Sequence, residues 1–307
     1  MPLLSTVYGR VCDGYLEADM LRDYQIECSA AILRELVERD RSSTLAVLPT
    51  GTGKTEIFWD VADRWSSGRV MMIAHREELV FQARDRGRKW GHDADVEMAE
   101  FKAPTSLFSG SKVVVASVQS LYQESRLARY DPLEFGLLII DEAHHSAKSC
   151  KTYSRIIQHC RQNERLKILG VSATPRRGDN LALGAVFDSL AYEYEILTTI
   201  NDSWIVPVRQ QYITVDGLDF SGIGTVAGDF HQARLAGMME QDKILYKVAC
   251  STAQIAGPEP ALIFAASVAP AGGIADIING QEQCRGKAIC ITGDTPRQQR
   301  RELLRRF

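Results

Sequence analysis

The apolar residues of this chain gather in short runs, and longer stretches with helical periodicity separate the runs. The runs in the first two thirds of the chain are LAVL (45–48), VMMIA (70–74), KVVVAS (112–117), LLII (137–140) and LKILGV (166–171). Within each run successive positions are apolar, as in parallel strands that helices cover on both faces. Strands that alternate with helices predict βαβ units. The pattern therefore indicates an α/β fold built on a doubly wound parallel sheet.

This rhythm of strand and helix is interrupted after residue 198 and returns after Pro258. The interruption contains a half-exposed strand pattern (WIVPVRQQYITVD), a loop rich in Gly and Asp, and a helical stretch. Beyond it we expect strands at 261–268 and 288–292, and a last helix with Thr295 as N-cap and Pro296 in its first turn. The predicted organisation is an N-terminal extension (1–20), a complete α/β domain (21–198), a connecting region (199–257) and the N-terminal part of a second α/β domain (258–307).

Composition agrees with a globular protein of this organisation. The chain has 307 residues, of which 45% are hydrophobic and 24% are charged, and at roughly 100 to 200 residues per domain this length predicts two domains. The formal net charge is −3, so no bulk basic excess indicates nucleic-acid binding. A polyanionic partner would have to be bound by a local patch.

The cysteines and the N-terminal segment bear on the compartment. The seven cysteines include no C-x-x-C pair, which fits neither a zinc site nor a disulfide framework and favours a reducing compartment. The first residues lack the pattern of a signal peptide, and no apolar run reaches the roughly 18 residues of a membrane-spanning helix. We therefore expect a cytoplasmic protein with no membrane segment.

The first chemical motif lies between the first predicted strand and the helix that follows it. Residues 48–55 read LPTGTGKT, with Leu48 where the strict phosphate-binding pattern begins with glycine. In this context backbone N–H groups at the helix start face phosphates, Lys54 adds positive charge, and the Thr55 hydroxyl can ligate Mg²⁺. The sequence therefore predicts a P-loop that binds ATP and Mg²⁺. Its predicted binding residues are Thr50, Gly51, Thr52, Gly53, Lys54 and Thr55.

The second motif follows the LLII run directly and reads Asp141-Glu142-Ala143-His144. In parallel sheets ligands bind at the carboxyl ends of the strands, where this pair of carboxylates would lie. Asp141 is predicted to hold Mg²⁺, and Glu142 to polarise the water that attacks the γ-phosphate. The alternative is an acidic loop after a buried strand. With the P-loop present we favour ATP hydrolysis, with Lys54, Asp141 and Glu142 as its catalytic residues.

The order of these strings resembles superfamily 2 helicases and translocases. Within that superfamily it is similar to the branch shared by restriction-enzyme motor subunits and related phage and repair helicases, over residues 20–307. The resemblance implies a RecA-like fold for both domains. The string 21–25 (LRDYQ) resembles the family's Leu-Arg-Pro-Tyr-Gln, with Asp23 in place of proline. By this resemblance Gln25 and Arg22 recognise the adenine.

Two further strings resemble the motifs that line the nucleic-acid track in this family. Residues 74–79 (AHREEL) resemble motif Ia, and residues 116–121 (ASVQSL) resemble motif Ib. A helix N-terminus with an arginine, and a hydroxyl with an amide at a strand end, are suited to hold phosphates without reading sequence. The predicted nucleic-acid residues are His75, Arg76, Ser117 and Gln119.

The string Ser172-Ala173-Thr174-Pro175 resembles motif III, which couples the nucleotide state to the gap between the domains. By the same resemblance His144 belongs to a coupling network with Ser172 and Thr174. The alternative for the string is a simple Ser/Thr cap before proline. A metal site at His144 and His145 is not favoured, because no further ligand has suitable spacing.

The chain stops at Phe307, before any segment that resembles motifs V and VI. We therefore expect an incomplete second RecA-like domain, from a truncated gene product, an expressed fragment or one part of a split motor. Such a chain would bind ATP and Mg²⁺ but hydrolyse ATP poorly alone, and a partner subunit or fragment would supply the missing motifs.

The resemblance implies an ATP-dependent DNA helicase or translocase, with RNA not excluded as the substrate. One alternative is the motor subunit of a type I or type III restriction endonuclease. Another is a non-catalytic module that binds nucleic acid under the control of ATP.

Three weaker signals are interpreted conservatively. Residues 222–227 fit the G-x-G-x-x-A fingerprint, but they do not follow a strand directly and are read as a loop. Asp93, Asp95 and the 100–102 string resemble nuclease carboxylates, but their cramped spacing favours an exposed acidic edge. The arginines of the last helix could form a basic stripe or a solvated face, and we favour the solvated face. They are Arg297, Arg300, Arg301, Arg305 and Arg306.

Overall fold

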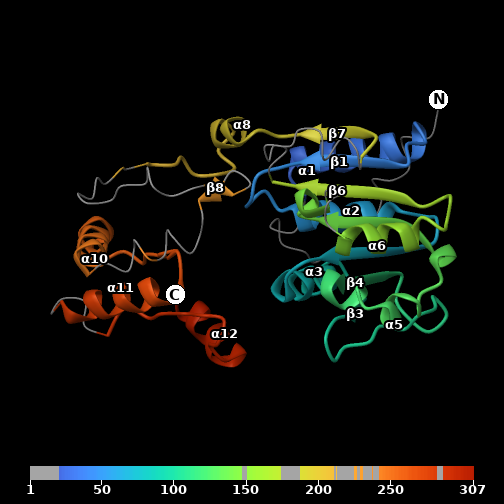
Figure 1. The fold of residues 1–307 in the computed structure, drawn as a ribbon. Coiled ribbons are helices and arrows are strands. Elements are labelled where there is room, and N and C mark those ends of the chain that lie inside the picture. The colour runs from blue at the N-terminus through green and yellow to red at the C-terminus, as the bar shows by residue number, and fades with distance from the viewer. Residues whose placement is uncertain are drawn as a thin grey trace. The chain divides into compact units, whose positions relative to one another are not determined.

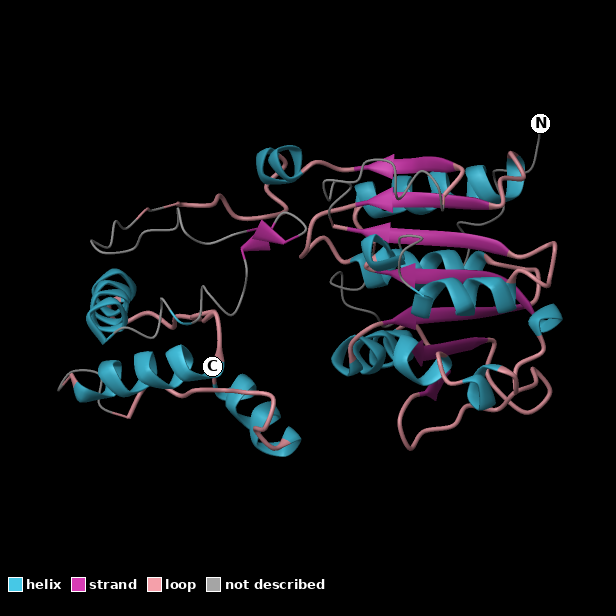
Figure 2. Ribbon diagram, in the orientation of Figure 1, coloured by secondary structure: helices cyan, strands magenta, loops and turns pink. Residues whose placement is uncertain are grey.

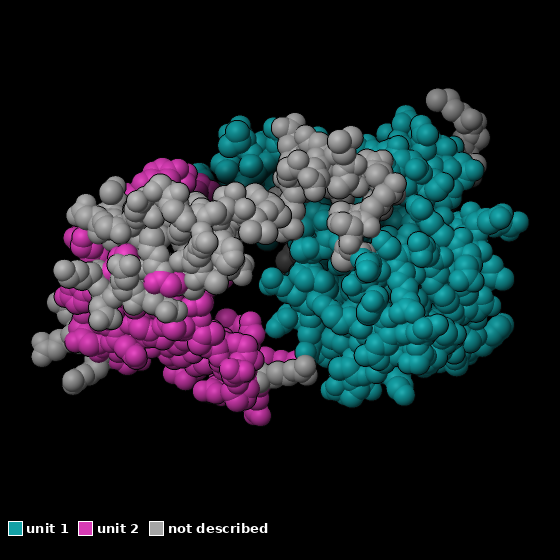
Figure 3. All heavy atoms as spheres, viewed as in Figure 1, with its two compact units in different colours: residues 1–207 teal, residues 208–307 magenta. Residues whose placement is uncertain are grey.

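The structure is a computed structural model that divides into two compact units, residues 1–207 and residues 208–307 (Figure 3). It describes residues 21–146, 151–173, 187–210, 212, 225–226, 229–230, 237, 242–281 and 286–307. The connecting region predicted from residue 199 thus begins inside the first unit, whose last residue is Pro207. Within the described ranges, no helix combines the length and apolarity that crossing a membrane requires.

The first unit is built on a seven-stranded, fully parallel sheet in the order β3-β4-β2-β5-β6-β1-β7 (Figures 1 and 2). This confirms the α/β fold predicted from the apolar runs. Its strands are β1 (Ser43–Val47), β2 (Arg69–Ala74), β3 (Ala94–Glu97), β4 (Val113–Ser117), β5 (Phe135–Asp141), β6 (Lys167–Ser172) and β7 (Ser189–Glu193).

Each predicted apolar run forms one of the five inner strands, while the two edge strands had no such signal. The residues of β3 (ADVE) and β7 (SLAYE) are mostly half-buried or exposed, whereas β1, β2 and β4 are buried throughout. An edge strand pairs on one side only and needs less apolar cover. Periodicity alone therefore missed β3 and β7.

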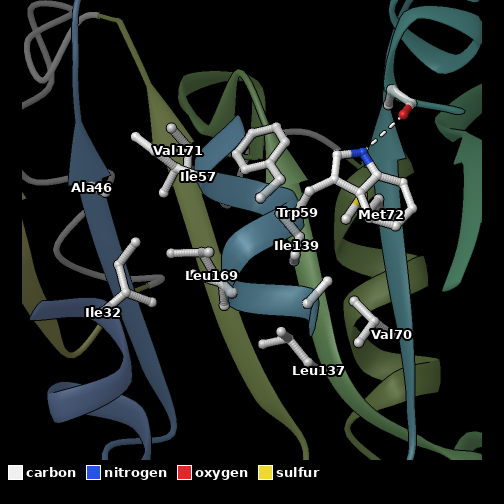
Figure 4. Close-up of a cluster of buried hydrophobic side chains, with 14 of the residues drawn as sticks. Ile32, Ala46, Ile57, Trp59, Val70, Met72, Leu137, Ile139, Leu169 and Val171 are labelled. Atoms are coloured by element: carbon white, nitrogen blue, oxygen red, sulfur yellow. Dashed lines mark hydrogen bonds between the residues drawn. The ribbon is translucent and has the colours of Figure 1, made fainter. Parts of the chain in front are cut away.

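Helices cover both faces of this sheet and enclose two buried clusters. On one face lie α1 (Asp23–Leu33) with the π-helical turn η2 (Arg34–Glu38), α2 (Lys54–Arg64) and α3 (Glu77–Lys89). Figure 4 shows this core, in which Trp59 packs near Met72 and donates its indole N–H to the Ala83 carbonyl at 2.9 Å. The other face is covered by α6 (Lys151–Cys160) and the short helices α4 (Val118–Leu121) and α5 (Glu124–Leu127). Two 3-10 turns flank β5, namely η3 (Pro132–Glu134) and η4 (Ala143–Ser146).

The first unit ends with α8 (Ile196–Asn201). Residues 206–210 form no strand, so the strand pattern predicted from residue 204 is not found in the part of it that is described.

Helices are the main elements of the second unit where the structure describes it. It contains α10 (Asp242–Ala256), α11 (Val268–Gly280), α12 (Arg297–Arg306) and a small antiparallel pair of β8 (Thr225–Val226) and β9 (Asp229–Phe230). Leu245, Ala249 and Ile274 form the buried contact between α10 and α11. The predicted N-cap was wrong by one residue: α12 begins at Arg297, and the Thr295 hydroxyl accepts from the Thr292 amide at 2.9 Å instead.

The two strands predicted in this unit were also wrong. Residues 260–265 and 288–292 form no strand, and α11 already begins at Val268. A strand requires a neighbour that pairs with its peptide groups. Here the N–H and C=O of Ala288 bond instead to the side chain of Asn279, at 3.0 and 2.9 Å. Phe264 is 89% exposed. This apolar side chain therefore does not pack into a core within the described part of the unit.

Candidate functional site

The turn between β1 and α2 has the backbone of an anion-binding loop. Gly51 and Gly53 have positive φ angles of 92° and 74°, and α2 begins directly after Gly53. A Cβ atom on Gly53 would lie 2.6 Å from Nε2 of Gln25, whereas one on Gly51 would meet nothing within 4 Å. Thr52 is fully buried and donates its hydroxyl to the Pro49 carbonyl at 2.7 Å. The exposed Thr50 and half-buried Thr55 flank this fixed turn. Free N–H groups and the positive end of the helix dipole meet at this point, as phosphate binding requires.

Two side chains of α1 fix the backbone of this loop by hydrogen bonds. Nε2 of Gln25 and the hydroxyl of Tyr24 both donate to the Thr52 carbonyl, at 2.8 and 2.7 Å. Oε1 of Gln25 accepts from the Arg22 amide at 2.9 Å, and Gln25 is 4% exposed. The two residues predicted to recognise adenine, Arg22 and Gln25, are therefore beside the loop, with Gln25 bonded to its backbone.

The exposed Arg22 side chain lies on an aromatic group that includes Trp204. Its guanidinium is 4.8 Å from the centre of the Trp204 ring, and its Nη1 donates to the Tyr24 hydroxyl at 3.2 Å. The Tyr24 ring also contacts Tyr194, with centroids 4.9 Å apart. Tyr24 and Trp204 were missed as site residues. The tyrosine of the LRDYQ string was a usable signal, but Trp204 lies in a segment without any motif.

The acidic pair stands at the carboxyl end of β5, opposite the loop. Oε1 of Glu142 is 3.2 Å from Nζ of Lys54, and the two side chains are only 22% and 11% exposed. Glu142 has a φ angle of 49°, which a non-glycine residue adopts only when its surroundings stabilise it. Oδ1 of Asp141 accepts from the Glu142 amide at 2.9 Å. The structure thus brings Lys54, Asp141 and Glu142 together, as the two separate motifs predict.

Burial shapes the electrostatics of Asp141. It raises the pKa of this carboxyl to about 6, and the negative charge of Glu142 adds to the effect. The positive charge of Lys54 and the hydrogen bond from the Glu142 amide act in the opposite direction. A buried carboxylate with one nearby cation can be stabilised by a further positive charge. These residues therefore fit a divalent cation, with Thr55 and Asp141 as its predicted ligands.

The DEAH histidine links this pair to β6. Nδ1 of His144 lies 3.0 Å from Oγ of Ser172, the last residue of β6, and 3.3 Å from Oε2 of Glu142. The predicted neighbourhood of His144 and Ser172 is present in the structure. The third predicted coupling residue, Thr174, lies outside the described residues.

The predicted track residues lie on the loops that follow β2 and β4. Nε2 of Gln119 donates to the His75 carbonyl at 2.6 Å, and Nε of Arg76 donates to Nε2 of His75 at 3.1 Å. Arg76 and Gln119 are exposed. Ser117 is 4% exposed, and its hydroxyl caps α4 by accepting from the Ser120 amide at 3.2 Å. His75, Arg76 and Gln119 therefore form one contiguous group. Ser117 is buried next to Gln119 and fixes the start of α4.

His145 is a further residue that the motifs did not assign to the site. Its ring centre lies 4.1 Å from that of His144 and 4.7 Å from that of His75. The doubled histidine after the DEA string was a visible signal. In the described part of the chain, no group of three or more His, Cys, Asp and Glu residues is placed to hold a metal ion.

The weaker signals have structural explanations where they are described. Oδ2 of Asp95 accepts from the Ser111 amide at 2.6 Å, while Asp93 and Glu100 are exposed. The fingerprint at 222–227 lies mostly outside the described residues. Four of the five arginines of the last helix are exposed, and the side chain of Arg297 is not described.

Comparison with known proteins matches residues 19–177 to the family of the Type III restriction enzyme, res subunit. IRC3 of Saccharomyces cerevisiae, named as an ATP-dependent helicase, is 32% identical over 240 residues, which cover 74% of this chain and 34% of that protein. The protein named as the mitochondrial ATP-dependent helicase irc3 of Schizosaccharomyces pombe is 34% identical over 195 residues, covering 61% and 31%. The chain therefore spans about a third of the length of these curated relatives.

A subunit of the type I restriction enzyme EcoAI endonuclease of Escherichia coli is also similar. It is 24% identical over 238 residues, which cover 73% of this chain and 27% of that protein. Among solved structures, the Hef helicase domain of Pyrococcus furiosus has a TM-score of 0.50 at 20% identity, over 86% of this chain and 54% of that one. This last likeness concerns the fold.

Proposed function

The chain belongs to the family of the Type III restriction enzyme, res subunit, and from this membership we propose that it binds ATP and couples ATP hydrolysis to movement on DNA. Its similarity to proteins named as ATP-dependent helicases places it in a helicase-like ATPase family. The whole activity, the substrate and the partners are part of the proposal, because the chain corresponds to about a third of those relatives.

The observation that carries the proposal is the contact between Lys54 and Glu142. The two residues come from motifs that are 88 positions apart, yet their charged atoms meet at 3.2 Å at the carboxyl edge of the sheet. In this arrangement Lys54 neutralises Glu142. A γ-phosphate would compete for Lys54, which would leave the Glu142 carboxylate available to accept a proton from water.

The other predicted residues near this contact are proposed to act as follows. The N–H groups of Gly51 to Lys54 would hold the phosphates, and Arg22 with Gln25 would hold the base. Thr55 and Asp141 would hold Mg²⁺, whose positive charge would offset that of the phosphates. His144, whose Nδ1 lies 3.0 Å from the Ser172 hydroxyl and 3.3 Å from Oε2 of Glu142, would help to position that carboxylate.

DNA is proposed as the partner on the likeness to the EcoAI subunit, while RNA stays an alternative. Arg76 and Gln119 are exposed side chains that suit phosphates and carry no base specificity. That likeness also favours a second candidate, the motor subunit of a restriction endonuclease.

We further propose that residues 258–307 belong to a second RecA-like domain.

The Lys54→Ala variant tests the proposal, with Lys89→Ala as a matched control at the exposed end of α3. We expect Lys54→Ala to weaken ATP binding at least about tenfold, because the loss of one charge-assisted contact to phosphate costs roughly 1.5 to 3 kcal/mol. Calorimetric titration measures the affinity, and phosphate release with single-stranded DNA, with RNA or with neither measures turnover. Equal ATP binding by Lys54→Ala and the unaltered chain would refute the nucleotide site. Binding without any turnover would favour the non-catalytic module.

A further inference from the structure

A row of three imidazole rings connects the predicted track to Glu142. His75 follows β2, and His144 with His145 lies in η4 after β5. These two strands are neighbours in the sheet, so both loops emerge side by side at its carboxyl edge. The ring of His145 stands between the other two, 4.7 Å from His75 and 4.1 Å from His144. At these centroid separations the rings are in van der Waals contact, and one cannot shift far without its neighbour.

The His75 end of the row is held by the two exposed track residues. Gln119 bonds to the His75 carbonyl, and Arg76 donates to Nε2 of the ring. A guanidinium only donates, so Nε2 must accept, and the proton of the neutral ring is on Nδ1. Burial and the charge of Arg76 lower the pKa of His75, which keeps the ring neutral. Nδ1 is buried and has no hydrogen-bond partner in the structure as described, so contacts made through Arg76, Gln119 and His145 determine where the ring lies.

The other end of the row reaches the predicted catalytic carboxylate. His144 contacts Oε2 of Glu142 at 3.3 Å, and Lys54 contacts Oε1 at 3.2 Å. The same His144 nitrogen is 3.0 Å from the Ser172 hydroxyl. Because Glu142 has an unfavourable backbone conformation, its side chain depends on these contacts for its position. A small shift of the His144 ring would therefore move the carboxylate.

We propose that His145 is a positioning residue that transmits occupancy of the DNA-backbone track to Glu142. The inference rests on the proposed function. A phosphate bound by Arg76 and Gln119 draws these side chains away from His75, and the ring of His75 then repacks against His145. His145 in turn shifts His144 between its contacts to Ser172 and to Glu142. The consequence is that bound DNA increases ATP turnover by improving the placement of the carboxylate.

The experiment measures the ratio of ATP turnover with single-stranded DNA to turnover without it. Three single variants are compared with the unaltered full chain: His145→Ala, His145→Phe and His75→Ala. His92→Ala is the control, because His92 stacks on Trp59 and pairs with Asp63, away from the row. Coupling between two sites typically changes an equilibrium about 5- to 150-fold. We therefore expect His145→Ala and His75→Ala to bring the ratio close to one, with His145→Phe and His92→Ala near the unaltered value.

The double variant His75→Ala/His145→Ala separates transmission from independent effects. If the rings act in series, the double variant has the same ratio as His75→Ala alone. An unchanged ratio in His145→Ala would overturn the inference, and so would a double variant whose ratio differs from that of His75→Ala alone. A variant that lowers both rates in proportion would also overturn it, because that is the result of a purely structural role.

The failure of this inference can be told apart from the failure of the proposed function. An unaltered chain that hydrolyses ATP without any response to DNA refutes the role of His145 and leaves the nucleotide site intact. An unaltered chain whose ATP binding does not depend on Lys54 refutes the proposed function itself.

Discussion

Two acidic sites stand at the carboxyl ends of strands in the same sheet, one fully buried and one half-buried, and they differ in how fully their charges are bonded. At the end of β3, Glu97 is completely buried and contacts Nη1 of Arg126 at 2.8 Å and Nη1 of Arg129 at 3.2 Å. It also accepts from the Tyr130 hydroxyl at 2.7 Å and from the Ala103 amide at 3.0 Å. Burial, together with the hydrogen bond to Glu97, raises the pKa of Tyr130, so its hydroxyl remains a donor.

Among the described residues, the cluster at the end of β5 has two carboxylates and one lysine contact. Lys54 reaches Glu142 at 3.2 Å, while burial raises the pKa of Asp141 to about 6. Glu142 also has the strained φ angle of 49°. The comparison teaches that a buried carboxylate with several partners stabilises a fold, whereas a carboxylate of raised pKa next to a residue on strained backbone indicates a ligand site.

Glu142→Gln should produce the largest effect, and it should be an effect on chemistry. The amide keeps the shape of the side chain but cannot take a proton from water, and general base catalysis typically contributes on the order of 10² to 10⁴ in rate. We expect ATP turnover to fall by about that factor while ATP affinity is retained. Phosphate release and calorimetric titration are the measurements. Turnover within threefold of the unaltered chain would mean that Glu142 is not the base.

Glu97→Ala should produce the largest effect on stability. Its removal leaves Arg126 and Arg129 without their buried partner, and breaking a buried ion pair costs about 3 to 5 kcal/mol. Urea unfolding measures the loss, with the exposed neighbour Glu100→Ala as the control, expected to stay within about 0.5 kcal/mol. The folded fraction of Glu97→Ala should bind ATP normally. A loss below about 1 kcal/mol would contradict the view that this cluster stabilises the fold.

Asp141→Asn should stabilise the ligand-free protein, in contrast to Glu97→Ala. The folded pKa of about 6 lies above the roughly 3.9 of an unfolded aspartate, so the charged carboxylate destabilises the fold above pH 6 by about 2 to 3 kcal/mol. This cost decreases as the pH falls from 6 towards 4, because the proton then binds in the folded state. Thermal unfolding at pH 8 and pH 5 should show a gain that is larger at pH 8. A gain that is equal at both values would exclude the carboxylate charge as its cause.

Gly53→Ala should lower stability by less than Glu97→Ala, and it should also weaken ATP binding. An alanine at a left-handed φ angle costs about 1 to 2 kcal/mol, and here its Cβ would also displace Gln25. Gly91→Ala is the control, since Gly91 has a φ angle of 75° and open space around its Cβ position. Gly53→Ala should lose at least as much stability by urea unfolding as Gly91→Ala, because of the added contact with Gln25, and only Gly53→Ala should lose ATP affinity. Weaker ATP binding by both variants would point to a general effect of strain.

The inner strands and the nucleotide motifs of the first unit could be predicted from the chain alone. Each depends on residues close together in sequence: a buried parallel strand requires a run of apolar residues, and the P-loop requires closely spaced glycines. The edge strands β3 and β7 could not be predicted, because one-sided pairing leaves a weak pattern. The strands expected at 261–268 and 288–292 failed for the opposite reason, since their apolar pattern has no pairing partner within the described residues.

The composition of the candidate site was also predictable, while its connections were not. The motifs identified Lys54, Asp141 and Glu142 as residue types, and their order along the chain indicated a helicase-like ATPase. The contact of Lys54 with Glu142, the bond from Tyr24 to the P-loop and the ring of His145 between two histidines join segments from different strands. Such contacts depend on which strands become neighbours in the sheet, and no local pattern records that order. The sequence by itself therefore determined the chemical groups and the layered fold, and the tertiary structure decided which groups touch, how strained they are and which charges remain under-compensated.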